Sequence, residues 1–130
     1  MARVAALGEK ISPIIYSVSG IDRVIQNELK VKTKAYNTHI QRFHFNEALG
    51  EIWQIISFAD RYINTEKPWT IHDEKKLFSI VKNTSFLILG IQHMVKPFLP
   101  ETAENITKQF WLKKSILHIK KGAALFPRLM

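Results

Sequence analysis

The residues best suited to bind a ligand lie in a short stretch around Trp69. Trp69 follows Lys67 and Pro68, and Arg61 lies shortly upstream. An aromatic ring held by a proline in a basic loop is a good platform for an unpaired base, because ring–base stacking contributes about 1–3 kcal/mol per base. Single-stranded RNA loops are read in this way, with bases turned onto aromatic rings and guanidinium planes. The residues alone predict equally well that Trp69 folds back as a lid over a helical bundle.

The other two tryptophans favour structural roles. Trp53 lies in a helical stretch rich in isoleucine, where a tryptophan is more often part of the core than of a ligand site. Trp111 follows Phe110 at the expected end of a helix, and we expect it to make a hydrophobic contact there.

No pattern in the chain points to catalysis or to a metal. His39 and His44 are five residues apart, which on one helix directs them to different faces, and the other histidines have no partner at metal-ligand spacing. Glu101 and Glu104 lie near an expected helix start, where acidic side chains offset the helix dipole. The chain has no nucleophile elbow and no phosphate-binding glycine loop. We therefore expect no catalytic residue, no metal and no cofactor in this chain.

The composition is that of one globular domain, spanning residues 1–130, with 46% hydrophobic residues. Lys and Arg number 19 against 11 Asp and Glu, for a net charge of +8. Such a surplus favours a polyanion or an anionic membrane as partner, and charge alone leaves a nucleic acid and a partnerless basic surface equally plausible.

The chain has no cysteine, which excludes disulfides and fits the cytoplasm, with an organellar compartment left open. We find no signal peptide and no apolar run approaching the ~18 residues of a membrane span.

Steps of three and four residues between apolar positions predict helices along most of the chain. The stripes cover residues 4–14, 21–43, 45–63, 77–95 and 100–110. Pro13 should kink or end the first helix. We expect an all-α bundle of about five helices with little or no sheet. Residues 120–130 should form an extended tail, held on the bundle by Leu125 and Phe126.

Four stretches resemble, in this order, the C-terminal helical domain of methionyl-tRNA synthetases. They are Phe45-x-x-Ala48-Leu49-x-x-Ile52-Trp53, Tyr62-Ile63-x-x-x-Lys67-Pro68-Trp69, Pro97-Phe98-Leu99-Pro100-Glu101-Thr102-Ala103 and Leu125-Phe126-Pro127-Arg128-Leu129. The last two favour the methionine enzyme over the related valine, isoleucine and leucine enzymes. The match covers essentially the whole chain, and four motifs in register are specific.

The resemblance implies roles for individual residues. Pro68 and Trp69 match the pair that packs against the CAU anticodon, with the tryptophan stacked on its first base. Arg3 matches the arginine that hydrogen-bonds anticodon bases together with an asparagine four residues away. That asparagine would fall just before Met1, so we expect that Met1 is not the native start. Lys67 and Arg61 are expected to attract tRNA phosphates.

A departure from the family pattern occurs at Asp60, where the family commonly has asparagine. We interpret this position as structural.

The resemblance also implies a parent enzyme, a class I ligase that uses ATP and magnesium to attach methionine to its tRNA. Its catalytic domain would lie in the same polypeptide, because the HIGH- and KMSKS-type signatures are absent from this chain. Two alternatives stay open: a helical protein-interaction domain that shares the fold, and the matching domain of a sister class I synthetase.

Overall fold

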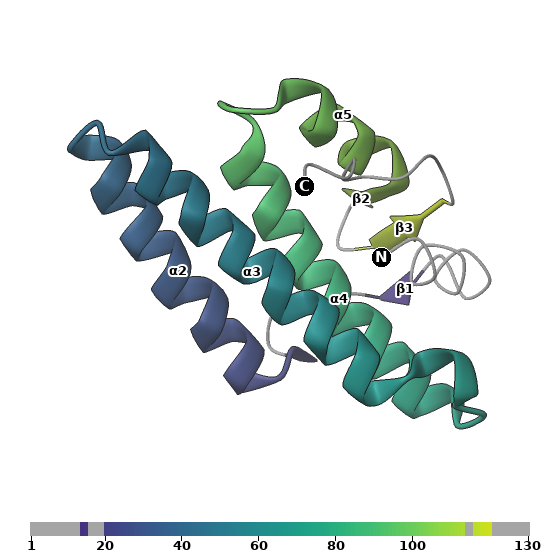
Figure 1. Ribbon diagram of the computed structural model, residues 1–130. Helices are drawn as coiled ribbons and strands as arrows, with labels where there is room; N and C mark the ends of the chain where they lie inside the picture. Colours follow the sequence, from purple (N-terminus) through teal and green to yellow (C-terminus); the bar gives the residue numbers. More distant parts are fainter. Residues whose placement is uncertain (1–13, 16–19, 114–115, 121–130) are drawn as a thin grey trace.

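The computed structural model describes residues 14–15, 20–113 and 116–120, which form four α-helices beside a small sheet (Figure 1). The α-helices are α2 (Arg23–Gln41), α3 (Phe45–Glu66), α4 (Glu74–Val95) and α5 (Pro100–Gln109). A 3-10 turn, η2 (Pro68–Thr70), connects α3 to α4. The strands are β1 (Ile14–Ile15), β2 (Phe110–Lys113) and β3 (Ile116–Ile119).

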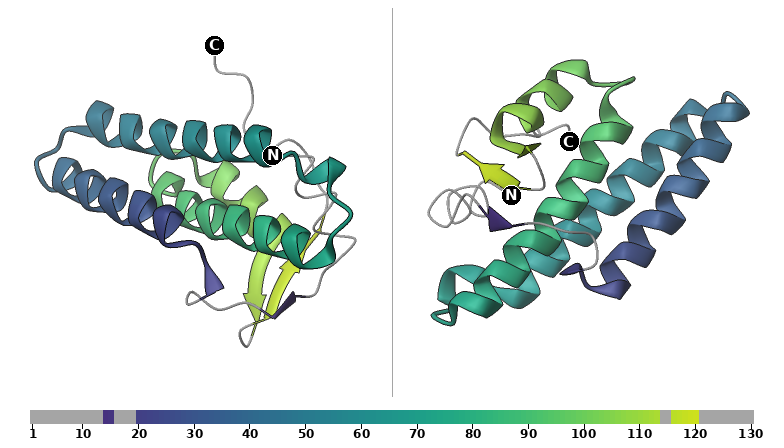
Figure 2. Two further views of the ribbon diagram at one scale, coloured as in Figure 1. Left: turned by 90° about the horizontal axis from the view of Figure 1, so that it is seen from below. Right: turned by 180° about the vertical axis from the view of Figure 1, so that it is seen from behind.

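Helices α2 and α3 lie side by side and antiparallel, and α4 packs against both (Figures 1 and 2). Helix α5 folds back on α4, and the sheet lies on the same side of α4 as α5, away from α2. The strand order is β1-β3-β2, and both pairs are antiparallel. Helix α3 has 22 residues and is about 33 Å long at 1.5 Å per residue. The turn before it and the turn after it are therefore at opposite ends of the bundle.

The core forms where the apolar stripes of the long helices meet. Its most buried side chains come mainly from α3 and α4, and include Ile52, Ile55, Leu87, Ile88 and Ile91. Helix α2 contributes less to the core, and its fully buried residues are Ile25 and Tyr36. Gly90 lets α2 approach α4, because a Cβ at this position would lie 2.6 Å from a methyl carbon of Leu29.

Helices α2 and α4 each begin with a capping carboxylate. The carboxylate of Asp22 accepts a hydrogen bond from the Val24 N–H (2.9 Å), and that of Asp73 accepts one from the Lys75 N–H (3.0 Å). These bonds satisfy N–H groups that have no partner within the helix. Pro100 occupies the first turn of α5, as predicted, where its missing N–H costs nothing.

The predicted helical bundle is confirmed, with four α-helices in the described residues where about five were expected, and with a small three-stranded sheet. The stripes at 21–43, 45–63, 77–95 and 100–110 each correspond to a helix. The first predicted helix falls largely outside the described residues, as does the tail beyond Lys120. Ile14, assigned to that helix, lies in β1 instead. None of the helices in the described part of the chain is long and apolar enough to cross a membrane.

Strands β2 and β3 form an antiparallel pair that the sequence did not locate. Its apolar residues lie on both faces: Phe110 and its partner Ile119 are buried on one face, whereas Trp111 and the exposed Ile116 belong to the other. The alternation that marks a half-buried strand is therefore missing. Trp111, predicted at a helix end, lies in β2.

Candidate nucleic-acid interface

Trp69 lies in a turn whose backbone is fixed on both sides. Helix α3 ends at Lys67, which takes the left-handed conformation (φ 47°) and donates its N–H to the Ile63 carbonyl (2.9 Å). Pro68 opens η2, since its fixed φ suits the first position of a helical turn. The Lys67 carbonyl accepts hydrogen bonds from the N–H (2.9 Å) and the hydroxyl (2.7 Å) of Thr70. These hydrogen bonds hold the backbone of Lys67, Pro68 and Trp69 in one conformation at the end of the bundle.

Pro68 and Trp69 differ in their burial. Pro68 is buried, whereas 39% of the Trp69 surface is exposed. The proline anchors the turn to the bundle, and part of the indole faces solvent. Stacking with a base requires such an open aromatic surface.

A buried amide connects three helices near this turn. Asn83 of α4 is only 4% exposed, and its side-chain oxygen accepts a hydrogen bond from the Asp22 N–H (3.0 Å) at the start of α2. Its side-chain nitrogen donates to the Tyr62 hydroxyl (3.0 Å), about one turn before the end of α3. Because a buried polar group without partners is costly, these two bonds fix the positions of α2 and α3 on α4.

Tyr62 takes part in this network. Burial raises the pKa of its hydroxyl above the ordinary value of about 10. The hydrogen bond from Asn83 lowers the pKa, and the negative charges of Glu66 and Asp22 raise it further. The net pKa is raised, so Tyr62 is neutral at physiological pH.

Sequence reasoning did not single out Asn83. One signal was available: an amide occurs inside the apolar stripe of α4, between Val81 and Thr84.

Charged side chains of both signs lie around the turn. The exposed cations are Arg61, Lys67, Lys75 and Lys76, and the exposed acids include Asp73 and Glu74. Exposed cations of this kind attract phosphates through screened electrostatic interactions. Asp60, for which we expected a structural role, is exposed as well.

Arg61 also lines two shallow hollows on the surface of α3, with volumes of about 400 and 410 Å³. One lies beside Tyr62, and the other extends to Trp53 and to Lys32 of α2. Trp53 packs against the core, as predicted. The guanidinium of Arg61 is thus placed between the end of α3 and the neighbouring helix.

Four of the five residues predicted to contact tRNA come together at this end of the bundle: Arg61, Lys67, Pro68 and Trp69. Arg3 lies outside the described residues and stays a prediction.

The histidines and Trp111 have surroundings that the sequence did not predict. His39 and His44 do not point apart: their ring centroids are 6.1 Å from each other, because α2 ends at Gln41 and the chain turns back. Trp111 stacks on His118 across the pair of β2 and β3, with centroids 5.4 Å apart and rings inclined by 8°. Residues 14–15, 20–113 and 116–120 contain no group of three or more side chains placed to hold a metal ion.

The described residues thus define a helical bundle domain that carries a partly exposed tryptophan at one end, in a chain of net charge +8. The chain belongs to the family described as the anticodon-binding domain of tRNA ligase, which matches residues 22–123.

Similar proteins within this family are methionine–tRNA ligases. The protein of Fusobacterium nucleatum is 30% identical over 108 residues, which cover 80% of this chain and 17% of that protein. The protein of Methanopyrus kandleri is 26% identical over 106 residues, covering 80% and 16%. That of Streptococcus pneumoniae is 22% identical over 138 residues, covering 92% and 21%. The chain therefore spans about a fifth or less of the length of the curated relatives it matches.

Proposed function

We propose that this chain is the part of a methionine–tRNA ligase that reads the anticodon. Membership of the anticodon-binding family and the similarity to methionine–tRNA ligases support this function. The intact protein would attach methionine to its tRNA, using ATP and magnesium in a catalytic domain of the same polypeptide. This chain would contribute no catalytic residue and no cofactor site. The cysteine-free composition fits the cytoplasm.

The observation that carries the proposal is the partly exposed Trp69 beside the buried Pro68. Trp69 stacks on the first base of the CAU anticodon, and Pro68 fixes the turn that presents it. Arg3 donates hydrogen bonds to base edges, which specify sequence, whereas Lys67 and Arg61 attract phosphates, which do not. Recognition is thus divided between base-specific and sequence-independent contacts.

The test is aminoacylation by the intact protein carrying Trp69→Ala, with tRNA of the CAU anticodon and with altered anticodons. Loss of stacking should reduce the discrimination between them by about 1–3 kcal/mol, or roughly 5- to 150-fold in the ratio of kcat/KM values. Trp69→Phe keeps an aromatic face and should retain most of the discrimination. Phe43→Ala, which removes an exposed ring at the opposite end of the bundle, is the matched control. Unchanged anticodon preference in Trp69→Ala would show that the stacking role is wrong.

Two binding measurements separate the alternatives. An anticodon stem-loop should bind with an affinity that falls as salt rises, with a slope of about −0.7 for each phosphate neutralised on a single strand. Absence of such binding would favour a protein-interaction domain. Preference for another anticodon would favour a sister synthetase.

A further inference from the structure

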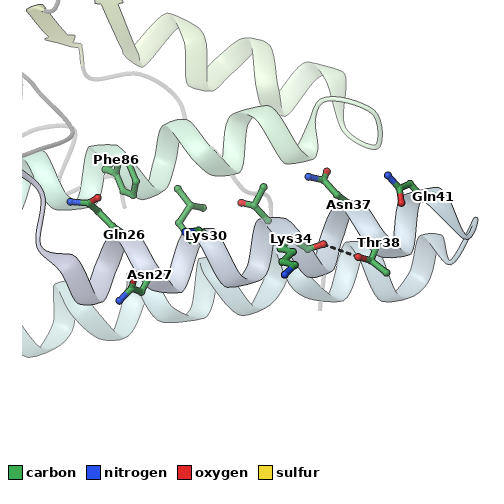
Figure 3. Close-up of a pocket in the computed structure, with 10 residues that line it drawn as sticks. Gln26, Asn27, Lys30, Lys34, Asn37, Thr38, Gln41 and Phe86 are labelled. Carbon is green, nitrogen blue, oxygen red and sulfur yellow. Dashed lines mark hydrogen bonds between the residues drawn. The ribbon is translucent and has the colours of Figure 1, made fainter.

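A groove between α2 and α4 has a chemistry that the Trp69 turn does not use (Figure 3). Its volume is about 710 Å³. Nearly all of its lining comes from one face of α2, and α4 contributes Phe86. Gln26 lies at one end of the groove and Gln41 at the other, so it follows most of the length of α2.

The charge of the groove is entirely positive. Lys30 and Lys34 line it, both are exposed, and no acidic residue is among the lining. Neither ammonium group has an ion-pair partner within residues 20–113, where the structure describes every side chain. The two lysines are four residues apart on a helix, a spacing at which like charges repel. An anion bound between them would remove this repulsion.

Lys32 shows the contrast on the same helix. Its ammonium group lies 3.8 Å from the Glu51 carboxylate and donates a hydrogen bond to Gln54 of α3. The charge of Lys32 is therefore matched within the bundle, whereas those of Lys30 and Lys34 are directed to solvent.

Amide side chains continue the positive face along the groove. Asn37 and Gln41 point from α2 toward α4, as does Gln26, and Lys34 lies on the outer wall (Figure 3). Amide N–H and ammonium groups both donate to phosphate oxygens, and such contacts carry no base specificity. Lys30 and Lys34 are separated by about 6 Å along the helix axis, which suits successive groups of a polyanion.

We propose that this groove is a second RNA-binding site, which holds backbone phosphates of the tRNA regardless of base sequence. The inference rests on the proposed function, since the RNA is the one whose anticodon Trp69 reads. Because α2 and α3 are antiparallel, the Gln26 end of the groove lies toward the end of the bundle that carries Trp69. The groove extends from there along α2, and the proposal places the stem that continues from the anticodon loop along it.

The test uses the intact protein with Lys30→Gln and Lys34→Gln combined. Its control combines Lys96→Gln and Lys113→Gln, which remove the same charge from exposed positions outside the groove. Filter binding is measured over a range of salt concentrations with the CAU tRNA and with a tRNA of altered anticodon. Loss of two phosphate contacts should reduce the salt slope by about 1.4–1.8 and weaken binding roughly tenfold or more at 0.1 M salt. The loss should be equal for both tRNAs, and the control should change the slope much less.

Further variants keep the outcome decisive. Lys30→Arg with Lys34→Arg retains both charges and should bind like the unaltered protein. Lys30→Glu with Lys34→Glu should weaken binding beyond the glutamine pair. If the glutamine pair loses no more affinity than its control, or loses it for one anticodon only, the groove is not a backbone site. Either result leaves the Trp69→Ala experiment unaffected, because that variant changes anticodon discrimination and not the salt slope.

Discussion

Two turns flank α3, and each contains a non-glycine residue in the left-handed conformation. At the turn after α2, Phe43 has φ 60°; its N–H bonds to the Ile40 carbonyl (3.1 Å), and the His44 N–H bonds to the His39 carbonyl (2.8 Å). At the turn after α3, Lys67 has φ 47°. This conformation satisfies carbonyl groups at a helix end and is normally supplied by glycine.

The side chains at the two turns differ in kind. Phe43 is 78% and Phe45 50% exposed, and their rings meet edge to face with centroids 6.1 Å apart. The contacts continue from Phe45 to Phe98 and from Phe98 to Tyr36 at 6.4 Å. At the other turn one partly exposed ring, Trp69, follows the exposed Lys67 and the buried Pro68.

The comparison shows that the same backbone geometry can present very different side chains. Similar left-handed closures present an apolar chain of rings at one end of α3 and a ring beside Lys67 at the other. Each turn carries an exposed cation, Arg42 at one and Lys67 at the other, so the rings distinguish them: a single indole beside a buried proline at one turn, and a chain of phenylalanine rings at the other.

Among the variants that compare the two ends of α3, Asn83→Ala is expected to lower the free energy of unfolding most. It removes both hydrogen bonds that connect α2, α3 and α4 near Trp69, and leaves the buried Tyr62 hydroxyl without its donor. The free energy of unfolding should fall by about 1–3 kcal/mol. At the other end, Tyr36→Phe removes a single bond to the Met94 carbonyl (2.9 Å) and should cost about 0.5–1.5 kcal/mol. Denaturant titration measures both, and a larger loss in Tyr36→Phe would contradict the view that the polar network is the stronger connection.

A smaller effect is expected from glycine at each left-handed position. Lys67→Gly should stabilise the fold by up to about 1 kcal/mol, since glycine adopts this conformation without a Cβ clash. Phe43→Gly should gain less, because it loses the ring contact with Phe45. Binding of tRNA should weaken in Lys67→Gly and stay constant in Phe43→Gly. Thermal unfolding and filter binding test the pair, and equal effects on tRNA binding would remove the functional distinction between the turns.

The smallest effect concerns alkaline pH. Burial raises the pKa of Tyr36, and burial with nearby carboxylates raises that of Tyr62. Because the unfolded tyrosines lose their protons first, stability is complete below pH 10 and declines as pH rises through the folded pKa values. Salt should screen the contribution of Glu66 and Asp22 at Tyr62, whereas desolvation at Tyr36 is insensitive to it. Unfolding of Tyr62→Phe and Tyr36→Phe at high pH measures this, and equal salt dependence at both ends would contradict the assignment.

The sequence by itself determined the helices and the turn between α3 and α4. The stripe at 45–63 became α3 (Phe45–Glu66), and that at 77–95 became α4 (Glu74–Val95). These features follow from local spacing, because residues three and four apart share a helix face whatever the rest of the chain does. A proline followed by tryptophan after a helix likewise marks a turn within a few residues.

Only the tertiary structure decided the features that join distant residues. Asn83 meets Asp22 and Tyr62 across 61 and 21 residues of sequence, and the groove exists only because α4 places Phe86 beside α2. Strands β2 and β3 form because they pair with each other, although neither alternates in polarity. Such contacts depend on how helices and strands pack, which local periodicity does not encode. The sequence thus predicted a tryptophan in a basic turn, and the fold decided that its proline is buried and that part of its ring faces solvent.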